Sequence, residues 1–461
     1  MRRITIFFIT LTLSVAALAQ QRPIAHNDPR TEVVSILCRL AGFQEYSQCY
    51  FPGYASEVDA YFAPVRDHAA VKMLREELSG SMRYDKAMNV ALYSPIIDGQ
   101  FATKDSVLWG ADENVRNNER ILQRFLKSCN NFIAESRFWE FFEGHKPFYA
   151  KVEAAMQANL DLIDMEWFDN YFQMYAHPEK HVYVSTLNGP SNYGIKPELR
   201  GDTTHLSVVM GCCFPGQDGE PAYQTATLVP IIVHEFCHSY CNPLCDKYYE
   251  AMKRPLAKVF DKNARLLSAQ AYPHPLIMSY ETFVRASVIF YMEQHFPNYS
   301  AADPLANEEE LGFILAPTIL DALRDRDLSK YPSMESYMPV LIERINAFSI
   351  RDYYRTAKVA DRKKAHVKGC KLPQHAGEGE IVIRFDKPMA DHLALYSGNT
   401  GAPFPTLSDR RPYYEWSKDQ KTLTLYVRLA PGRYAFSVYK GFVTADGNPL
   451  SKVMFYDFEV K

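Results

Sequence analysis

The sequence predicts an α+β protein: a mostly helical domain with a small β-sheet, followed by an all-β module. Three observations lead to this fold class. Apolar residues recur three and four positions apart through most of the chain up to about residue 350, as on the buried face of a helix. Two short β-branched segments interrupt this pattern near the middle of the chain. Beyond about residue 380, short alternating segments are separated by Gly and Pro turns, which is typical of antiparallel strands.

Length and composition set the limits of the interpretation. The chain has 461 residues, enough for two to four domains of about 150 residues each. Apolar residues make up 47% and charged residues 23%, which excludes a disordered chain, a collagen-like chain or a disulfide knot. The 51 Lys and Arg residues are balanced by 54 Asp and Glu residues, so the net charge is −3. This balance argues against nucleic acid as the main partner.

The first residues predict export. Two arginines precede an apolar run over residues 4–18, and small residues at Ala17 and Ala19 complete the pattern of a signal peptide over residues 1–19, cleaved after Ala19. A membrane anchor is the alternative, but the run of about 15 residues is shorter than the ~20 that a spanning helix needs. No later stretch is apolar enough to cross a bilayer. The mature protein is therefore expected in the periplasm or outside the cell, without a membrane span.

The cysteines allow two interpretations. Nine is an odd number, so at least one thiol stays unpaired within the chain. Cys38 and Cys49 are close enough in sequence for a disulfide. Cys237, Cys241 and Cys245 recur every four residues and would share one helix face. Such a row can bind a metal through thiolates, but small buried core residues are the favoured interpretation.

Residues 20–160 form a predicted N-terminal helical region that packs on the domain after it. The expected helices share apolar positions three and four apart and lie at 31–41, 55–61, 68–78, 114–132 and 148–163. No internal repeat is present.

Residues 161–357 form the predicted second part. Segments 181–187 and 205–210 are β-branched and are expected to be strands, with a turn or loop at 188–194. Asn242-Pro243 is expected to end the helix that follows them, because proline cannot donate the helical hydrogen bond. The expected helices lie at 227–240, 247–270, 278–295, 308–326 and 334–348.

The C-terminal part has a different pattern of apolar and turn residues. Residues 358–378 are predicted to be a linker, because the stretch 358–371 is basic and has no apolar period. Residues 379–461 are predicted to form a small antiparallel sandwich. Its expected strands are separated by turn residues and lie at 381–385, 422–427, 432–438 and 453–458.

One motif carries chemistry: His-Glu-x-x-His at His234, Glu235 and His238, on a predicted helix. Residues four apart lie on one helical face, so both imidazoles can bind one zinc ion. From its position beside the first histidine, the Glu235 carboxylate can reach the activated water without binding the metal. Two core histidines satisfied by hydrogen bonds are the alternative. The apolar residues 228–233 predict a buried helix, where unpartnered histidines would be costly, and this favours Zn²⁺ binding.

A catalytic zinc site needs a third protein ligand. A histidine six residues after the second is absent, because position 244 is Leu. Glu281 is the favoured third ligand, because it heads an otherwise apolar predicted helix, where a carboxylate needs a strong partner. An ion pair with Arg285 is the alternative, and both hold if Arg285 supports the carboxylate from behind. The other candidates are carboxylates further along these predicted helices: Asp246, Glu250 and Glu293.

Two further features concern substrate binding. A developing oxyanion needs a hydrogen-bond donor, and four donors lie in suitable regions, each with an ordinary structural role as the alternative: Tyr193, His274, Tyr280 and Arg285.

The strand at 204–210 is predicted to be an edge strand that lines the active-site cleft and pairs with an extended peptide. Gly211 at its end would let a ligand approach the backbone closely. An interior strand, paired on both sides, is the alternative, which the apolar Leu206, Val208 and Val209 allow.

The segment from His234 to Pro243, His-Glu-Phe-x-His-Ser-Tyr-x-Asn-Pro, resembles the gluzincin metallopeptidases. It is most similar to a family of exported bacterial proteins described as a domain of unknown function. Asn192-Tyr193-Gly194 upstream and the segment from Glu281 to Arg285 downstream fit this resemblance, which covers about residues 145–350. It implies a zincin-like domain in which His234, His238 and Glu281 are ligands and Glu235 is the base. The chain departs from many gluzincins at Arg285, where they carry an Asp.

A second, shorter resemblance concerns the C-terminal part. Phe385-Asp-Lys-Pro-Met389 and Asp446-Gly-Asn-Pro-Leu450 are similar to the ends of bacterial Ig-like domains of exported proteins. This implies an Ig-like sandwich that serves as a spacer, a substrate-binding unit or a brace.

The gluzincin resemblance and the predicted signal peptide indicate a secreted zinc metallopeptidase that acts on a peptide or protein substrate. A non-catalytic exported protein with a structural zinc site is the first alternative. A zinc hydrolase of a non-peptide substrate is the second, because the same zinc chemistry serves both kinds of substrate.

Overall fold

The computed structural model describes residues 22–103 and 117–461, apart from residues 177, 202, 212, 217, 399 and 401. The predicted signal peptide and Cys212 therefore lie outside the described residues. About 49% of the protein is helical and 19% is in strands, which confirms the α+β class. The chain divides into two compact units, Met1–Phe348 and Ser349–Lys461.

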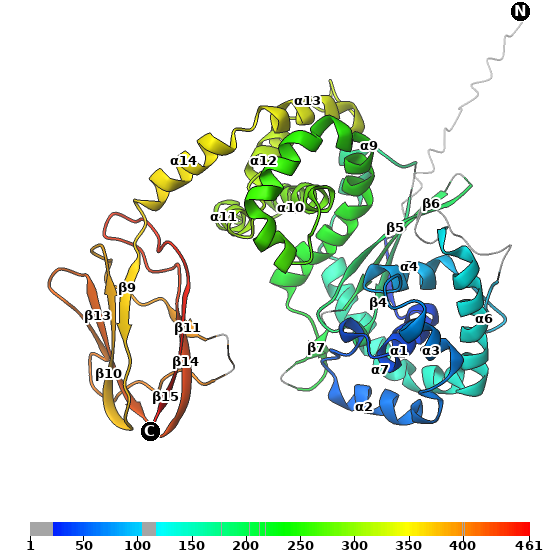
Figure 1. Ribbon diagram of the computed structural model, residues 1–461, viewed down its shortest axis with the longest axis horizontal. Coiled ribbons are helices and arrows are strands. Elements are labelled where there is room, and N and C mark those ends of the chain that lie inside the picture. Colours follow the sequence, from blue (N-terminus) through cyan, green and yellow to red (C-terminus); the bar gives the residue numbers. More distant parts are fainter. Residues whose placement is uncertain are drawn as a thin grey trace, which may run out of the picture. The chain divides into compact units, whose positions relative to one another are not determined.

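Helices dominate the N-terminal part of the first unit, as predicted (Figure 1). Asp28 begins the first of them: its carboxylate accepts a hydrogen bond from the Arg30 backbone N–H, and Pro29 occupies the first helical position. The helices of this part, together with two short paired strands, are α1 (Pro29–Leu40), α2 (Pro52–Tyr61), α3 (Ala69–Glu76), α4 (Asp85–Tyr93), β2 (Ile96–Ile97), β3 (Gln100–Phe101), α6 (Glu119–Glu135) and α7 (Phe138–Leu160).

A four-stranded mixed sheet follows, in the order β1-β4-β6-β5. Strands β1 (Ala25–His26), β4 (Glu179–Val184) and β6 (Thr203–Met210) are parallel, and β5 (Tyr193–Arg200) runs antiparallel to β6. The prediction that the strand at 204–210 lies at an edge is wrong, because β6 pairs with β4 on one side and β5 on the other. Its residues from Leu206 to Met210 are all buried, as is typical of such an interior strand.

Gly211 also has a different role from the predicted one. A Cβ atom at this position would lie 2.5 Å from the Gly189 carbonyl oxygen and 2.6 Å from that of Ser191. The close approach is therefore made by the chain's own loop before β5, and not by a ligand. The Gly211 N–H donates to Asn192 Oδ1 at 3.0 Å, which fixes this crossing.

Helix α9 (Thr225–Ala269) is a single helix of 45 residues, so the predicted end at Asn242-Pro243 is wrong. Proline at position 243 removes the N–H that would bond the carbonyl four residues earlier, at Ser239. The Tyr175 hydroxyl donates to that carbonyl instead, at 2.7 Å. Pro255 is compensated in the same way, because Asn346 Nδ2 donates to the Ala251 carbonyl at 3.2 Å. Side chains distant in sequence thus replace the hydrogen bonds that α9 loses at Pro243 and Pro255.

Helix α10 (Pro275–His295) packs along α9 (Figure 1). The segment predicted as one helix at 308–326 is two helices, because Gly312 has a φ of 101° and ends the first of them. The remaining elements of this unit are α8 (Glu166–Phe172), β7 (Phe214–Pro215), β8 (Pro221–Ala222), α11 (Ala302–Glu310), α12 (Ala316–Arg324) and α13 (Met334–Ala347).

The second unit contains two antiparallel sheets with one shared apolar core, which includes Ile383 and Leu425 from one sheet and Phe436 from the other. The stretch 358–371, expected to be an irregular linker, instead contains the end of α14 (Ile350–Asp361) and all of strand β9 (Val367–Lys371). Strand β9 pairs with β10, so this stretch belongs to the folded unit. The other strands are β10 (Gly377–Phe385), β11 (Leu395–Ser397), β12 (Tyr414–Trp416), β13 (Thr422–Leu429), β14 (Gly432–Val438) and β15 (Met454–Val460).

Every cysteine among the described residues is a free thiol, so the suggested bridge between Cys38 and Cys49 is not formed. Cys237, Cys241 and Cys245 are fully buried in α9, as expected of core residues. Burial raises the pKa of all three thiols, which disfavours the thiolate that a metal needs. In the described ranges, every helix is too short or too polar to span a bilayer.

Candidate metal centre

Helix α9 brings the two motif histidines together on one face. Their Nε2 atoms lie 3.1 Å apart. The neighbouring helix α10 adds Glu281, whose carboxylate oxygens lie 3.6 Å from His234 Nε2 and 3.5 Å from His238 Nε2. The three predicted metal ligands therefore converge in space, although they come from two helices.

The spacing of these donor atoms fits a metal ion. A tetrahedral zinc site with bonds of about 2.0–2.1 Å has ligand atoms about 3.3 Å apart. The three separations around His234, His238 and Glu281 lie close to this value. The side chains of all three residues are largely removed from solvent, with exposed fractions of 21%, 16% and 10%.

The other carboxylates considered as third ligands lie in ordinary ion pairs or hydrogen bonds. Glu250 is exposed and pairs with Lys253 at 3.1 Å. Glu293 pairs with Arg324. Asp246 accepts a hydrogen bond from the Tyr280 hydroxyl.

The charge states of His234 and Glu281 suit a cation. Burial lowers the pKa of His234 to about 3, so its imidazole is neutral at pH 7. Burial opposes the ionisation of Glu281, but His234, His238 and the guanidinium of Arg285 stabilise the carboxylate and lower its pKa. Two imidazoles and one carboxylate are the deprotonated forms that bind zinc.

Residues behind the predicted ligands fix their orientation. His238 Nδ1 lies 3.1 Å from Asn242 Oδ1, so an Nδ1–H of His238 can donate to this oxygen and leave Nε2 to face the centre. Arg285 Nε donates to Glu281 at 3.2 Å, and Arg285 also binds Glu308 at 2.8 Å. The ion pair proposed as an alternative to ligation is thus present, and it holds the carboxylate beside the histidines.

Glu235, the predicted base, is buried beside this centre. Burial raises its pKa to about 7, while the backbone of Gly194 acts in the opposite direction through a hydrogen bond. A carboxylate with a pKa near 7 is suited to accepting and returning a proton at neutral pH. The backbone of Gly194 on β5 therefore contacts the predicted base.

The predicted oxyanion donors are spread over different surroundings. Arg285 is held by two carboxylates, and Tyr280 is bound to Asp246. His274 caps α10 by accepting a hydrogen bond from the Leu276 N–H at 3.2 Å. Tyr193 is buried on β5.

Two residues of the centre were missed from the sequence. Asn242 was interpreted as part of a helix stop and of the gluzincin-like motif, without a contact to the site, although its position four residues after His238 is a helical spacing that places it beside that residue. Tyr272, between α9 and α10, accepts from Arg285 at 3.3 Å and lies beside Glu281. No spacing in the sequence indicates this second contact.

Comparisons with known proteins identify the family. Residues 25–344 match the family model described as Domain of unknown function (DUF4932). No curated protein and no solved structure matches the chain. The match begins at β1 and ends in α13, so the N-terminal helices and the candidate metal centre lie in one family domain. The protein belongs to the DUF4932 family.

Proposed function

We propose that the protein is an exported zinc-dependent metallopeptidase. The observation that carries the proposal is the convergence of His234, His238 and Glu281 at zinc-like separations, with Glu235 buried beside them. The gluzincin-like motif and the apolar N-terminal run support the peptidase class and the export.

The roles of the residues follow from their chemistry. His234, His238 and Glu281 would hold the zinc ion. A bound zinc ion would supply a Lewis acid for the scissile carbonyl and the attacking water. Glu235 takes the proton from the water and passes it to the leaving amine, which is general base and then general acid catalysis by one carboxylate. Asn242 and Arg285 keep two of the ligands in position.

The number of ligands favours a catalytic over a structural zinc site. Structural sites have four protein ligands, whereas catalytic sites have three and leave a position for water. The group of metal-binding side chains at this centre has three members among the described residues. A zincin-like fold for residues 161–357 and an Ig-like sandwich for residues 379–461 belong to the same proposal, with the C-terminal part as a spacer, brace or substrate-binding module.

A pair of glutamine variants tests the function. Glu235→Gln should keep its zinc and its circular dichroism spectrum but lose hydrolysis of a broad peptide library, because an amide cannot accept the proton. Glu250→Gln is the matched control, since Glu250 lies on the same helix but is exposed and paired with Lys253. It should keep full activity.

Metal analysis completes the test. His234→Ala and His238→Ala should each lose one equivalent of zinc relative to the wild type. Retention of this zinc in both variants would refute the centre. Retained zinc with no hydrolysis of any peptide by the wild type would favour a structural site or a non-peptide substrate.

A further inference from the structure

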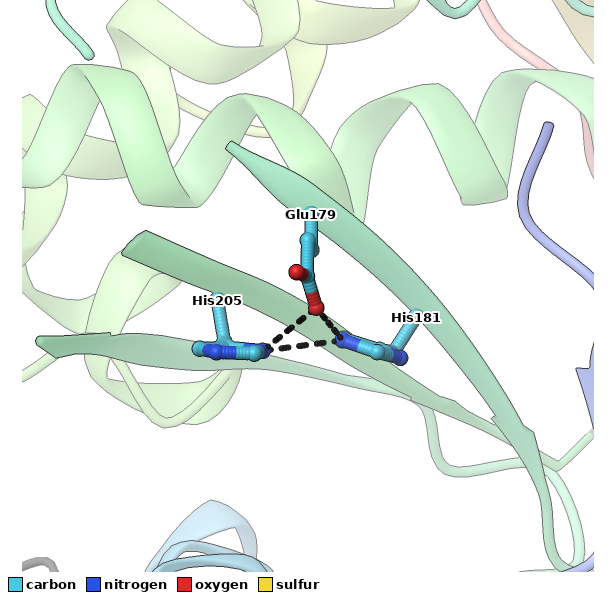
Figure 2. A group of neighbouring side chains, drawn as sticks. All are labelled: Glu179, His181 and His205. Carbon is cyan, nitrogen blue, oxygen red and sulfur yellow. Dashed lines mark hydrogen bonds and ion pairs between the residues drawn. The ribbon is translucent and has the colours of Figure 1, made fainter. Parts of the chain in front are cut away.

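The mixed sheet carries a second group of side chains that could hold a metal ion, distinct from the candidate centre on α9 and α10. Glu179 and His181 lie on β4, and His205 lies on the adjacent strand β6 (Figure 2). Their donor atoms all lie within 4.8 Å of one another. This group shares no residue with the proposed catalytic centre, so it is independent of the proposed function.

The strand register brings the three side chains to one face of the sheet. Glu179 and His205 are register partners across the parallel pair of β4 and β6. His181 follows Glu179 by two residues and therefore points to the same face. Figure 2 shows the three side chains directed toward one another, with the two imidazoles nearly coplanar.

The distances repeat those of the first centre. His181 Nε2 lies 3.0 Å from His205 Nδ1. Glu179 Oε2 lies 3.3 Å from His205 Nδ1 and 3.7 Å from His181 Nε2. The first centre has the same composition of two histidines and one glutamate, with separations of 3.1, 3.5 and 3.6 Å. Both groups match the ligand separation of about 3.3 Å in a tetrahedral site.

The surroundings leave room for further ligands. The group lines an open pocket of about 520 Å³. Arg30, the guanidinium in this pocket, is bound to Asp28 at 2.8 Å and to the Leu92 carbonyl at 3.0 Å. Among the described residues, Glu179 forms ion pairs with His181 and His205.

We propose that Glu179, His181 and His205 bind a second divalent transition-metal ion, of the class represented by Zn²⁺, with its open coordination position facing the pocket. Two imidazoles and one carboxylate favour such ions over Ca²⁺ and Mg²⁺, which take oxygen ligands. The Glu179 side chain is 59% exposed, against 10% for Glu281. The second site is therefore weaker than the first and exchanges its metal more readily.

Calorimetric titration of Zn²⁺ into metal-free protein tests the proposal. The His234→Ala/His238→Ala double variant, which lacks the first site, should still bind one zinc ion. Adding His181→Ala and His205→Ala to it should abolish this binding. Adding Glu179→Gln alone should weaken it about tenfold or more, since even supporting residues of metal sites have effects of this size.

A matched control and a second route keep the test decisive. His26→Ala in the double variant should leave zinc binding unchanged, because the His26 ring stands 6.5 Å from that of His181 and is not one of the three ligands. Should the double variant not fold, Glu179→Gln in the wild-type background serves instead, because an exposed side chain tolerates the change. Wild type should then bind two zinc ions, the weaker of which is impaired in Glu179→Gln. A folded double variant that binds no zinc, or a weaker site that Glu179→Gln leaves unimpaired, would overturn the proposal.

Discussion

Gly194 on β5 lies so close to Glu235 on α9 that a Cβ atom on the glycine would stand 2.4 Å from the Glu235 carbonyl oxygen. The same Cβ would lie 3.0 Å from Cβ of His238. The sheet and the motif helix thus touch at the predicted base and at one predicted ligand, and the absence of a side chain at position 194 allows this contact.

Gly194→Ala should therefore disturb the centre. We expect it to push β5 away from α9, to destabilise the protein by roughly 1–3 kcal/mol as overpacking does, and to weaken zinc binding. Urea unfolding and zinc titration measure the two effects. Gly144→Ala is the matched control, because a Cβ there meets nothing within 4 Å and the position lies inside helix α7. That change should be neutral or stabilising by up to about 1 kcal/mol. Equal behaviour of the two variants would contradict the close approach.

Because the Glu235 carboxylate is buried, we expect its ionisation to lower the free energy of unfolding as the pH rises. Its pKa is raised to about 7 in the folded protein, above the ordinary value of 4.5. The protonated carboxyl adds its full contribution to the free energy of unfolding below pH 4.5. This contribution is lost as the pH rises to about 7. Metal-free Glu235→Gln should be more stable than the metal-free wild type by about 3 kcal/mol at pH 8, with the difference vanishing at pH 4.5.

Chemical denaturation of the chelator-treated proteins at the two pH values provides the measurement. Glu250→Gln should show no such pH-dependent gain, because Glu250 is exposed. A metal-free Glu235→Gln variant that is no more stable than the wild type at pH 8 would contradict this prediction. It would show that the ionised Glu235 carboxylate does not lower the free energy of unfolding.

The convergence of His234, His238 and Glu281 could be predicted from the sequence because its main spacing is local. His234 and His238 are four residues apart, and any helix through them places both on one face. Glu281 could be proposed because a carboxylate in an apolar helix needs a partner. The second group was missed, because His181 and His205 become neighbours only through the register of β4 and β6. The local sequence pattern does not determine this register.

The fold was predicted well where contacts are local and poorly where distant residues override local preference. The α+β class and most helices follow from apolar periodicity. Helix α9 passes through Pro243 because Tyr175, far away in sequence, replaces the lost donor. The edge position of β6 was misjudged, because β5 contains Pro197 and charged residues and has no clear strand pattern, yet it covers that edge.

Limited proteolysis should report the boundary between the two units. Helix α14 has no buried residue, and the turn after it contains Arg362, Lys363 and Lys364. Trypsin should cut first in 351–364, because exposed segments are cleaved before packed ones, and should leave two stable fragments. Strand β9 is paired with β10 and should resist. Early cleavage after Lys368 or Lys371, identified by mass spectrometry, would show that β9 is not part of the folded unit.

The contact between the Tyr175 hydroxyl and the Ser239 carbonyl should be energetically coupled to Pro243. In the wild type, Tyr175→Phe leaves the Ser239 carbonyl without this donor and should cost about 1–2 kcal/mol. In a Pro243→Ala background, the restored N–H at position 243 bonds the same carbonyl, so Tyr175→Phe should cost less than about 0.5 kcal/mol. Urea denaturation of the four proteins in this cycle measures the coupling.

An exposed tyrosine provides the control for this cycle. Tyr50→Phe should have little effect in either background, because Tyr50 is 43% exposed. An equal cost of Tyr175→Phe with proline and with alanine at position 243 would show that the hydroxyl does not replace the missing helical donor. The predicted coupling matters for the candidate metal centre, because Ser239 directly follows His238 in α9 and Pro243 directly follows Asn242, the residue beside His238 Nδ1. Loss of the Tyr175 contact should therefore also weaken zinc binding, and should do so less when alanine replaces Pro243.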